Sequence, residues 1–328
     1  MNLINAAALV SLALVPLALA QDQKQPSGQP VRPSTPGAAS TPGAPTPAIA
    51  EEAARKEPWR VSFTLKGSHA FSADLDGTPG EFAVSRLGAD LGLLIPVSEK
   101  ARLAVGLDWT QSLYDFKDAT GFAPGFSEPW SDTFDVGLSA IYSRPLEGAW
   151  GMFIGALANS SGEEGADFSD TLTYGGLGGV SYQFSETFTA SIGVLAQSRL
   201  EDSAMVIPIP GIDWKISEEW RLSSMNKPGL SLFYSPSKEW TFSLGATYEG
   251  REFRLNDRDA APEGVGRDRG VPVVLGAEWS PSRRITVGGF VGAYVYRKLR
   301  LEDNGGNELS EFEVDPAPTA GLNIKFAF

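Results

Sequence analysis

The stretch Gly321-Leu-Asn-Ile-Lys-Phe-Ala-Phe328 gives the strongest indication of fold in this chain of 328 residues. Leu322, Ile324, Phe326 and Phe328 alternate with small or polar residues. Successive side chains of a β-strand point to opposite faces, so this pattern predicts a strand with one apolar face. The apolar face extends to the last residue of the sequence.

The same alternation recurs through residues 59–328. The clearest example is 101–109, in which every odd residue is apolar and every even residue is Arg, Ala, Gly or Asp. Comparable stretches begin at Trp59, Phe188, Trp240 and Val271. A period of two over so many segments predicts an all-β chain.

Short polar turns alternate with longer polar connections in this region. The short turns are 96–100, 144–148, 184–187, 216–219, 235–239 and 280–284. The longer connections are 68–80, 117–131, 160–170, 201–205, 256–270 and 302–311. This sorting is typical of a transmembrane barrel with short periplasmic turns and longer outer loops, and a soluble β-sandwich has no reason to show it.

The pattern predicts a single closed, antiparallel, up-and-down transmembrane β-barrel of about 14 strands, with both ends periplasmic. Two short spans flank Lys227-Pro228, so 12 full strands with an irregular insert are an alternative. Pro208 and Pro210 make the eighth span imperfect, because proline removes a ladder donor. The predicted spans are 59–68, 81–95, 101–115, 132–143, 150–160, 171–184, 187–199, 206–216, 219–226, 229–235, 239–255, 271–280, 284–300 and 312–328.

Aromatic residues gather near the ends of the predicted strands, where amphipathic rings favour the membrane interfaces. The girdle expected beside the short turns consists of Trp59, Trp150, Trp220, Trp240 and Trp279. The girdle expected beside the long loops consists of Tyr114, Phe116, Tyr174, Tyr248 and Phe253. A general preference of strands for aromatics is the alternative explanation.

The region before the barrel divides into two segments. Residues 1–20 contain an apolar run that ends in Ala18-Leu19-Ala20, which predicts a secretory signal peptide rather than a membrane anchor. Residues 21–57 are rich in Pro, Ser, Thr, Gly and Ala, and this composition predicts a disordered linker. We expect a plain tether, with a partner-binding arm as the alternative. The barrel is expected over 58–328.

Composition excludes several classes of function. The chain has no cysteine, so disulfides, thiol catalysis and Cys-ligated metals are absent. A formal net charge of −13 argues against nucleic-acid binding. Acidic loop residues such as Glu163, Glu164 and Glu302 could bind divalent cations beside lipid headgroups, but a solvated surface is the simpler interpretation.

No catalytic, metal or cofactor site is predicted. The single histidine, His69, ends the first predicted strand, and a catalytic triad would need a nucleophile and an orienting group beside it. The glycine-rich run 175–179 is not followed by a helix or a Lys-Ser/Thr pair, so it indicates close strand packing rather than a phosphate site. We therefore expect the protein not to be an enzyme.

Charged residues on the polar side of the alternation are the candidate functional residues. The candidates that face the lumen are Arg60, Lys66, Arg102, Asp108, Asp135, Asp213, Lys215, Glu249 and Glu278. They could line an aqueous pore, or they could pair across the lumen and fill it as a polar core. Both interpretations remain open from the sequence.

Together, these features resemble bacterial outer-membrane β-barrel proteins. The closing strand, with Leu322, Ile324, Phe326 and Phe328, resembles the signal that the barrel assembly machinery reads. The segment 208–222 further resembles a family of uncharacterised barrels from diderm bacteria. This resemblance implies a porin-like fold in the outer membrane, in contact with its lipids, lipopolysaccharide and assembly machinery. It implies no catalytic residue.

The expected function is passive transport of small polar solutes. A closed barrel with a structural or surface-interaction role is the first alternative, and a lipid-modifying barrel enzyme is a weaker one. A soluble secreted β-sandwich is the remaining rival.

Overall fold

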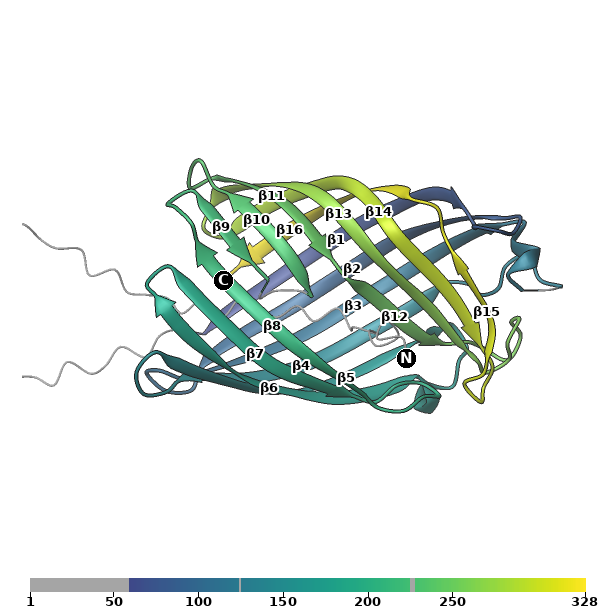
Figure 1. Cartoon of the computed structure of the whole chain (residues 1–328), viewed down its shortest axis with the longest axis horizontal. Helices are drawn as coiled ribbons and strands as arrows, with labels where there is room; N and C mark the ends of the chain where they lie inside the picture. Colours follow the sequence, from purple (N-terminus) through teal and green to yellow (C-terminus); the bar gives the residue numbers. More distant parts are fainter. Residues whose placement is uncertain (1–58, 124, 225–227) are drawn as a thin grey trace, which may run out of the picture.

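The computed structural model describes residues 59–123, 125–224 and 228–328, and it shows one antiparallel sheet closed into a barrel (Figure 1). The expected signal peptide (1–20) and linker (21–57) lie outside the described residues. The strands are β1 (Arg60–Asp74), β2 (Glu81–Pro96), β3 (Arg102–Lys117), β4 (Thr133–Pro145), β5 (Trp150–Glu163), β6 (Leu172–Ser185), β7 (Phe188–Gln197), β8 (Met205–Lys215), β9 (Trp220–Ser223), β10 (Gly229–Tyr234), β11 (Trp240–Thr247), β12 (Glu249–Arg254), β13 (Val265–Ser282), β14 (Ile285–Glu302), β15 (Glu308–Glu313) and β16 (Ala317–Ala327).

Two short 3-10 helices, η1 (Ala119–Gly121) and η2 (Phe168–Thr171), lie in the long connections. No helix in the described part of the chain has the length and apolar character needed to cross a membrane.

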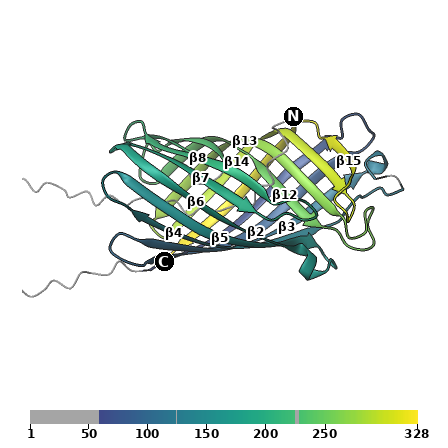
Figure 2. The same ribbon diagram turned by 60° about the horizontal axis from the view of Figure 1, so that its bottom comes forward.

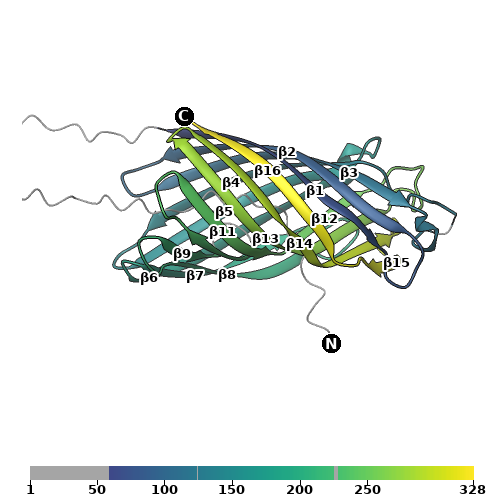
Figure 3. The same cartoon turned by 90° about the horizontal axis from the view of Figure 1, so that it is seen from above.

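The barrel closes between its first and last strands. Ser62 of β1 lies opposite Ala327 of β16, and the register continues to Ala70 opposite Thr319. Figure 3 shows β1 and β16 side by side. Closure pairs the backbone groups of two strands that would otherwise be sheet edges, which a bilayer does not tolerate.

The described residues form fourteen strands when β11 with β12, and β15 with β16, are each counted as one interrupted strand. This confirms the predicted fold. The twelve-strand alternative is wrong, because β9 and β10 both belong to the wall: β9 pairs with β8 and β10, and β10 pairs with β9 and β11. Both strands are nevertheless short, at 4 and 6 residues.

Short turns gather at one end of the barrel, and the long loops and 3-10 helices gather at the other (Figure 2). Two strands extend further toward the long loops than the sequence predicts. β1 continues to Asp74 because its last residues pair with β2. β13 begins at Val265 because residues 265–270 pair with both β12 and β14.

A belt of aromatic side chains surrounds the short-turn end. Its rings touch in two series, with centroid separations of 4.7–6.5 Å. The first series is Trp150, Tyr182, Phe184, Phe188 and Trp214; the second is Trp220, Tyr234, Phe242, Trp240 and Trp279. Rings in this position are suited to the boundary between hydrocarbon and water.

The prediction of a second girdle at the long-loop end is wrong for three residues. Phe116 and Phe253 are buried, and Tyr114 is half-buried against them. The reason is register: Tyr114 and Phe116 continue the inward-facing series that contains Asp108. Tyr174 does face outward and is 69% exposed.

Candidate functional site: the barrel interior

The nine candidate lumen residues lie on one face of the sheet. Leu65, Leu107 and Trp214 are exposed and mark the outer face. The charged residue next to each of them points the opposite way, because side chains alternate along a strand. The nine residues are Arg60, Lys66, Arg102, Asp108, Asp135, Asp213, Lys215, Glu249 and Glu278. They share a face but are distributed over several strands.

Four of the inward-facing residues form a polar band on β1–β4. Lys66 Nζ lies 2.6 Å from Asp90 Oδ1. Asp90 is directly opposite Asp108 on the neighbouring strand. Asp135 accepts a hydrogen bond of 3.1 Å from Asn159 Nδ2 on β5. The polar band therefore holds three carboxylates and one ammonium group, which gives this wall a local negative charge.

The remaining candidates lie elsewhere on the inner wall. Arg221 holds Asp213 through two hydrogen bonds of 2.6 and 2.7 Å, and Lys215 pairs with Glu218 at 2.8 Å. These pairs lie near the short turns, as do Arg60, Arg102 and Glu278. Glu249 is far from them, on β12, where it accepts a 2.8 Å hydrogen bond from the Tyr294 hydroxyl.

A buried group of charges around Asp268 was not among the candidates. Asp268 accepts hydrogen bonds from Arg86 at 2.5 Å and from Arg297 at 2.6 and 2.9 Å. All three side chains are buried. The Arg297 guanidinium also lies 4.5 Å from the centre of the Phe82 ring. The alternation in 81–95 could have indicated Arg86, but Asp268 fell in a segment predicted as a loop.

A hydrophobic cluster fills the interior at the long-loop end, and we call it the long-loop core. Trp130 is at its centre, with ring centroids of Phe116, Phe122 and Phe253 at 5.2–5.4 Å. Its buried members are Ala70, Leu75, Phe82, Val84, Phe116, Ala119, Phe122, Ala123, Trp130, Phe253, Leu255, Ala261, Tyr294, Leu299, Leu301 and Val314.

Strand β12 completes this closure from the opposite side of the barrel. Arg254 at its end forms a parallel bridge with Gly162 of β5. The Arg254 guanidinium donates to the carbonyl oxygens of Asp170 and Glu263 and to the Glu201 carboxylate. Side chains therefore occupy the axial path at this end.

At the long-loop end, strands β12–β14 carry the long-loop core on one face, and the loop between β7 and β8 covers their opposite face. Arg199 Nε lies 3.2 Å from Glu252 Oε2, and the backbone N–H of Leu200 donates to Glu252 Oε1 at 2.6 Å. Beneath them, Arg267 Nη2 lies 2.6 Å from Glu302 Oε2. At the long-loop end of β12–β14, ion pairs thus line one face of the strands, and the long-loop core lines the opposite face.

The inner wall of β4–β8 carries an apolar patch, which we call the inner apolar patch. It consists of Ile141, Leu157, Leu177 and Leu195, with Phe153 and Ile209 packed against them. Glycines make room for the Phe153 ring: a Cβ at Gly179 or Gly193 would lie only 2.5 or 2.8 Å from it. The lumen is therefore polar along one band and apolar along another.

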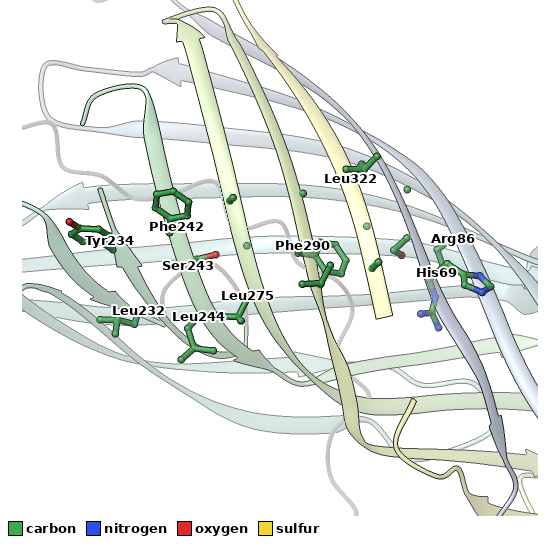
Figure 4. A pocket seen from close by; sticks show the side chains of 18 of the residues that line it. His69, Arg86, Leu232, Tyr234, Phe242, Ser243, Leu244, Leu275, Phe290 and Leu322 are labelled. Atoms are coloured by element: carbon green, nitrogen blue, oxygen red, sulfur yellow. The ribbon is translucent and has the colours of Figure 1, made fainter. Parts of the chain in front are cut away.

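A hollow of about 1210 Å³ lies on the outer face (Figure 4). Six strands contribute three consecutive residues each, as in 67–69 and 275–277, and the first and third of each triplet point outward. The floor is shallow because small residues such as Gly67, Ala277 and Gly289 lie between large ones. This hollow faces lipid and is separate from the lumen.

His69 also lies on the outer face. Its Nδ1 is 2.9 Å from the Ser85 hydroxyl, and its ring contacts Phe71 edge-on with a centroid separation of 4.7 Å. Within the described residues, no carboxylate or amide side chain is hydrogen-bonded to His69, so the third member of a triad is missing there. Glycines 175–179 lie within β6 and form no loop. The described residues hold no cluster of three or more potential metal ligands.

Leu322, Ile324 and Phe326 of the predicted assembly signal lie on the outer face of β16, and Phe328 follows the end of this strand. Leu322 and Phe328 are 71% and 75% exposed. Ile324 lies opposite Leu65, and Phe326 lies opposite Phe63 of β1. Their apolar side chains thus form a continuous strip beside the closing seam of the barrel.

A closed antiparallel barrel with an apolar outer wall, an aromatic belt and inward-facing charges defines this chain as a porin-like β-barrel. Residues 129–327 match a protein family described as "Domain of unknown function (DUF6268)". The match spans more than half of the sequence, and the chain belongs to this family.

Several solved structures are similar to this chain at low sequence identity. An outer membrane channel from Pseudomonas putida F1 has a TM-score of 0.44 at 9% identity, over 82% of this chain and 95% of that chain. The P. putida toluene transporter TodX has a TM-score of 0.40 at 9% identity, over 82% and 89%. The translocator domain of the autotransporter NalP from Neisseria meningitidis has a TM-score of 0.32 at 15% identity, over 82% and 88%. No curated protein sequence matches the chain.

Proposed function

We propose that this protein is an outer-membrane channel for small polar solutes, with its long loops outside the cell and its short turns in the periplasm. The sorting of connections by length and the aromatic belt beside the short turns support this placement. In this location, the protein would contact outer-membrane lipids and lipopolysaccharide.

The polar band carries the transport proposal. Lys66, Asp90, Asp108 and Asp135 lie within the membrane-spanning height of the strands. Charges at this depth are costly unless they are paired or hydrated. Among the described residues, Lys66 and Asp90 form the only ion pair of this band, and Asp135 accepts one hydrogen bond from Asn159. Water beside Asp108 and Asp135 is therefore the natural complement. The excess of carboxylates would favour cationic solutes.

The long-loop core means that this conformation is closed at its outer end. Conduction would require β12 to move away from β5, and Arg254 is the main polar connection between β12 and that side. The same observation supports a second candidate, a permanently closed barrel with a structural or surface-interaction role.

Single-channel recording of the protein refolded in a planar bilayer tests the proposal. The wild type should show rare current steps, and Arg254→Ala should show frequent ones because β12 loses its anchor. Asp108→Asn should reduce the preference for cations. Heat-modifiable gel mobility confirms that each variant is folded. Folded but silent proteins, with Arg254→Ala included, would favour the closed barrel.

We also propose that Leu322, Ile324, Phe326 and Phe328 are recognised by the barrel assembly machinery. Their apolar strip is exposed in the folded barrel, and Phe328 exchanges backbone hydrogen bonds with Val61 only after closure. Deletion of Phe328 should lower the amount of protein in outer membranes and leave refolding in detergent unchanged. An unchanged cellular level would contradict this role.

A further inference from the structure

The barrel wall contains one stretch in which neighbouring strands do not pair. Residues 205–211 of β8 pair with β7 on one side, whereas β9 reaches only residues 213–215 on the other. Across this stretch lies β12, whose residues 250–253 pair with β13 alone among the described strands. Figure 1 shows β9 and β10 ending partway along the barrel, between β8 and β12. We call the space between 205–211 and 250–253 the unpaired seam.

The sequence of β8 fits a strand edge that remains unpaired. Lys215 donates its N–H to Thr187 at the start of β7, whereas Ile212 donates its N–H toward Ser224, on the other side of β8. Backbone donors alternate along a strand, so the even residues of β8 point their nitrogens toward the seam. Pro208 and Pro210 occupy two of these positions and have no N–H. Proline therefore removes donors that would otherwise be unsatisfied in lipid.

Both sides of the β8 edge are apolar. On the inner side, Ile209 packs against the inner apolar patch, which includes Leu195 of β7. On the outer side, Val206 is 65% exposed, and Pro208 and Pro210 are exposed as well. A molecule that moves from the inner apolar patch to the lipid would meet no charged side chain on this part of β8.

Polar contacts hold the seam closed near the long loops. Glu252 of β12 binds Arg199 and the Leu200 N–H of the β7–β8 loop. The adjoining cavity is only about 30 Å³, room for about two water molecules. Asn159 Oδ1 and Gln197 Oε1 line it without a protein partner. These two acceptors face the small cavity and receive no hydrogen bond from β12.

We propose that the unpaired seam is a lateral passage between the barrel interior and the membrane, for uncharged molecules with an apolar body. The long-loop core blocks the axial path, whereas the seam lacks the backbone ladder that closes the rest of the wall. Separation of β12 from the β7–β8 loop opens the passage. Glu252 fastens β12 to that loop, together with Arg254, which donates to Glu201. This route is distinct from the conduction of polar solutes, because lipid does not accept a polar solute.

Uptake of N-phenyl-1-naphthylamine tests the passage. This uncharged dye becomes fluorescent in membranes, and lipopolysaccharide slows its entry into intact cells. Cells that produce the full protein should take it up several-fold faster than cells without it. Glu252→Gln should accelerate uptake further, because it weakens the contact with Arg199. Glu239→Gln, in an exposed short turn, is the matched control and should match the wild type.

An engineered, reversible disulfide across the seam provides the second test of the passage. The chain has no cysteine, and Met205 and Gly250 line the same small cavity from opposite sides of the seam. The double variant Met205→Cys, Gly250→Cys should lose the uptake enhancement on oxidation and regain it on reduction. If the disulfide does not form, the comparison of dye uptake between Glu252→Gln and the wild type decides whether the passage exists.

Equal uptake with and without the protein, or no response to Glu252→Gln in a folded barrel, would overturn the passage. Ion conductance of the same proteins is recorded in parallel. Conductance without any effect on dye uptake would refute the passage and leave the proposed channel intact. Dye uptake without conductance would refute the channel and support the passage.

Discussion

Asp268 is the residue whose replacement should cost this barrel most. Its single carboxylate pairs with both Arg86 and Arg297, and all three side chains are buried. Asp268→Asn keeps the shape but leaves two buried guanidinium groups without a counter-charge. Breaking one partner of a buried ion pair costs about 3–5 kcal/mol, and we expect a loss of this size in the free energy of unfolding. Urea titration monitored by heat-modifiable mobility would measure it.

Asp213→Asn is the matched control. Asp213 also accepts two hydrogen bonds from an arginine, Arg221, but both side chains are partly exposed. Exposed ion pairs contribute about 0–1 kcal/mol, so this variant should remain close to the wild type. Equal losses in the two variants would show that burial does not set the strength of these pairs.

The sequence predicts the direction of an inward-facing charge but not its partner. Alternation around Asp108 is regular, so its face is readable from neighbours such as Leu107 and Trp109. Asp268 and Arg86 are separated by 182 positions and meet only because the barrel closes. No local pattern indicates such a contact, and the long-loop core depends on the same kind of distant pairing.

At the scale of the strand, the two prolines of β8 should protect its unpaired edge. Pro208→Val together with Pro210→Val restores two N–H groups that point into the seam, where no described strand accepts them. An unsatisfied backbone group in lipid costs on the order of several kcal/mol, so this variant should unfold at lower urea concentration. Pro281→Ala, at the exposed short-turn end of β13, should have little effect. Unchanged stability of the β8 variant would indicate that the seam is hydrated or paired.

Strand ends were predicted less well than strand centres, for a physical reason. Residues 265–270 contain Arg267, Asp268 and Arg269, a composition that indicates a loop. They form a strand because β12 and β14 pair with both of its edges and ion pairs satisfy its charges. Tertiary contacts outweigh local propensity there. In contrast, the membrane-facing centres of the strands are constrained by lipid to remain apolar, and the alternation is visible.

For the whole molecule, the strand number was predictable because each turn leaves its own polar signature. Strands β11 and β12 correspond to one predicted span, 239–255, whereas residues 308–311 of β15 fall in the predicted connection 302–311. The contact of the end of β12 with β5 was not predictable, because β5 is about ninety positions earlier in the sequence.

The orientation of the barrel in the membrane yields a prediction for the whole molecule. Asn304 lies in the β14–β15 connection, at the long-loop end of the barrel, and Lys238 lies in the β10–β11 turn at the opposite end; both are exposed. The chain has no native cysteine, so Asn304→Cys and Lys238→Cys each carry one thiol. A membrane-impermeant maleimide should label Asn304→Cys in intact cells and label Lys238→Cys only after the outer membrane is disrupted. Labelling of Lys238→Cys alone in intact cells would reverse the orientation, and equal labelling of both would contradict a membrane-spanning barrel.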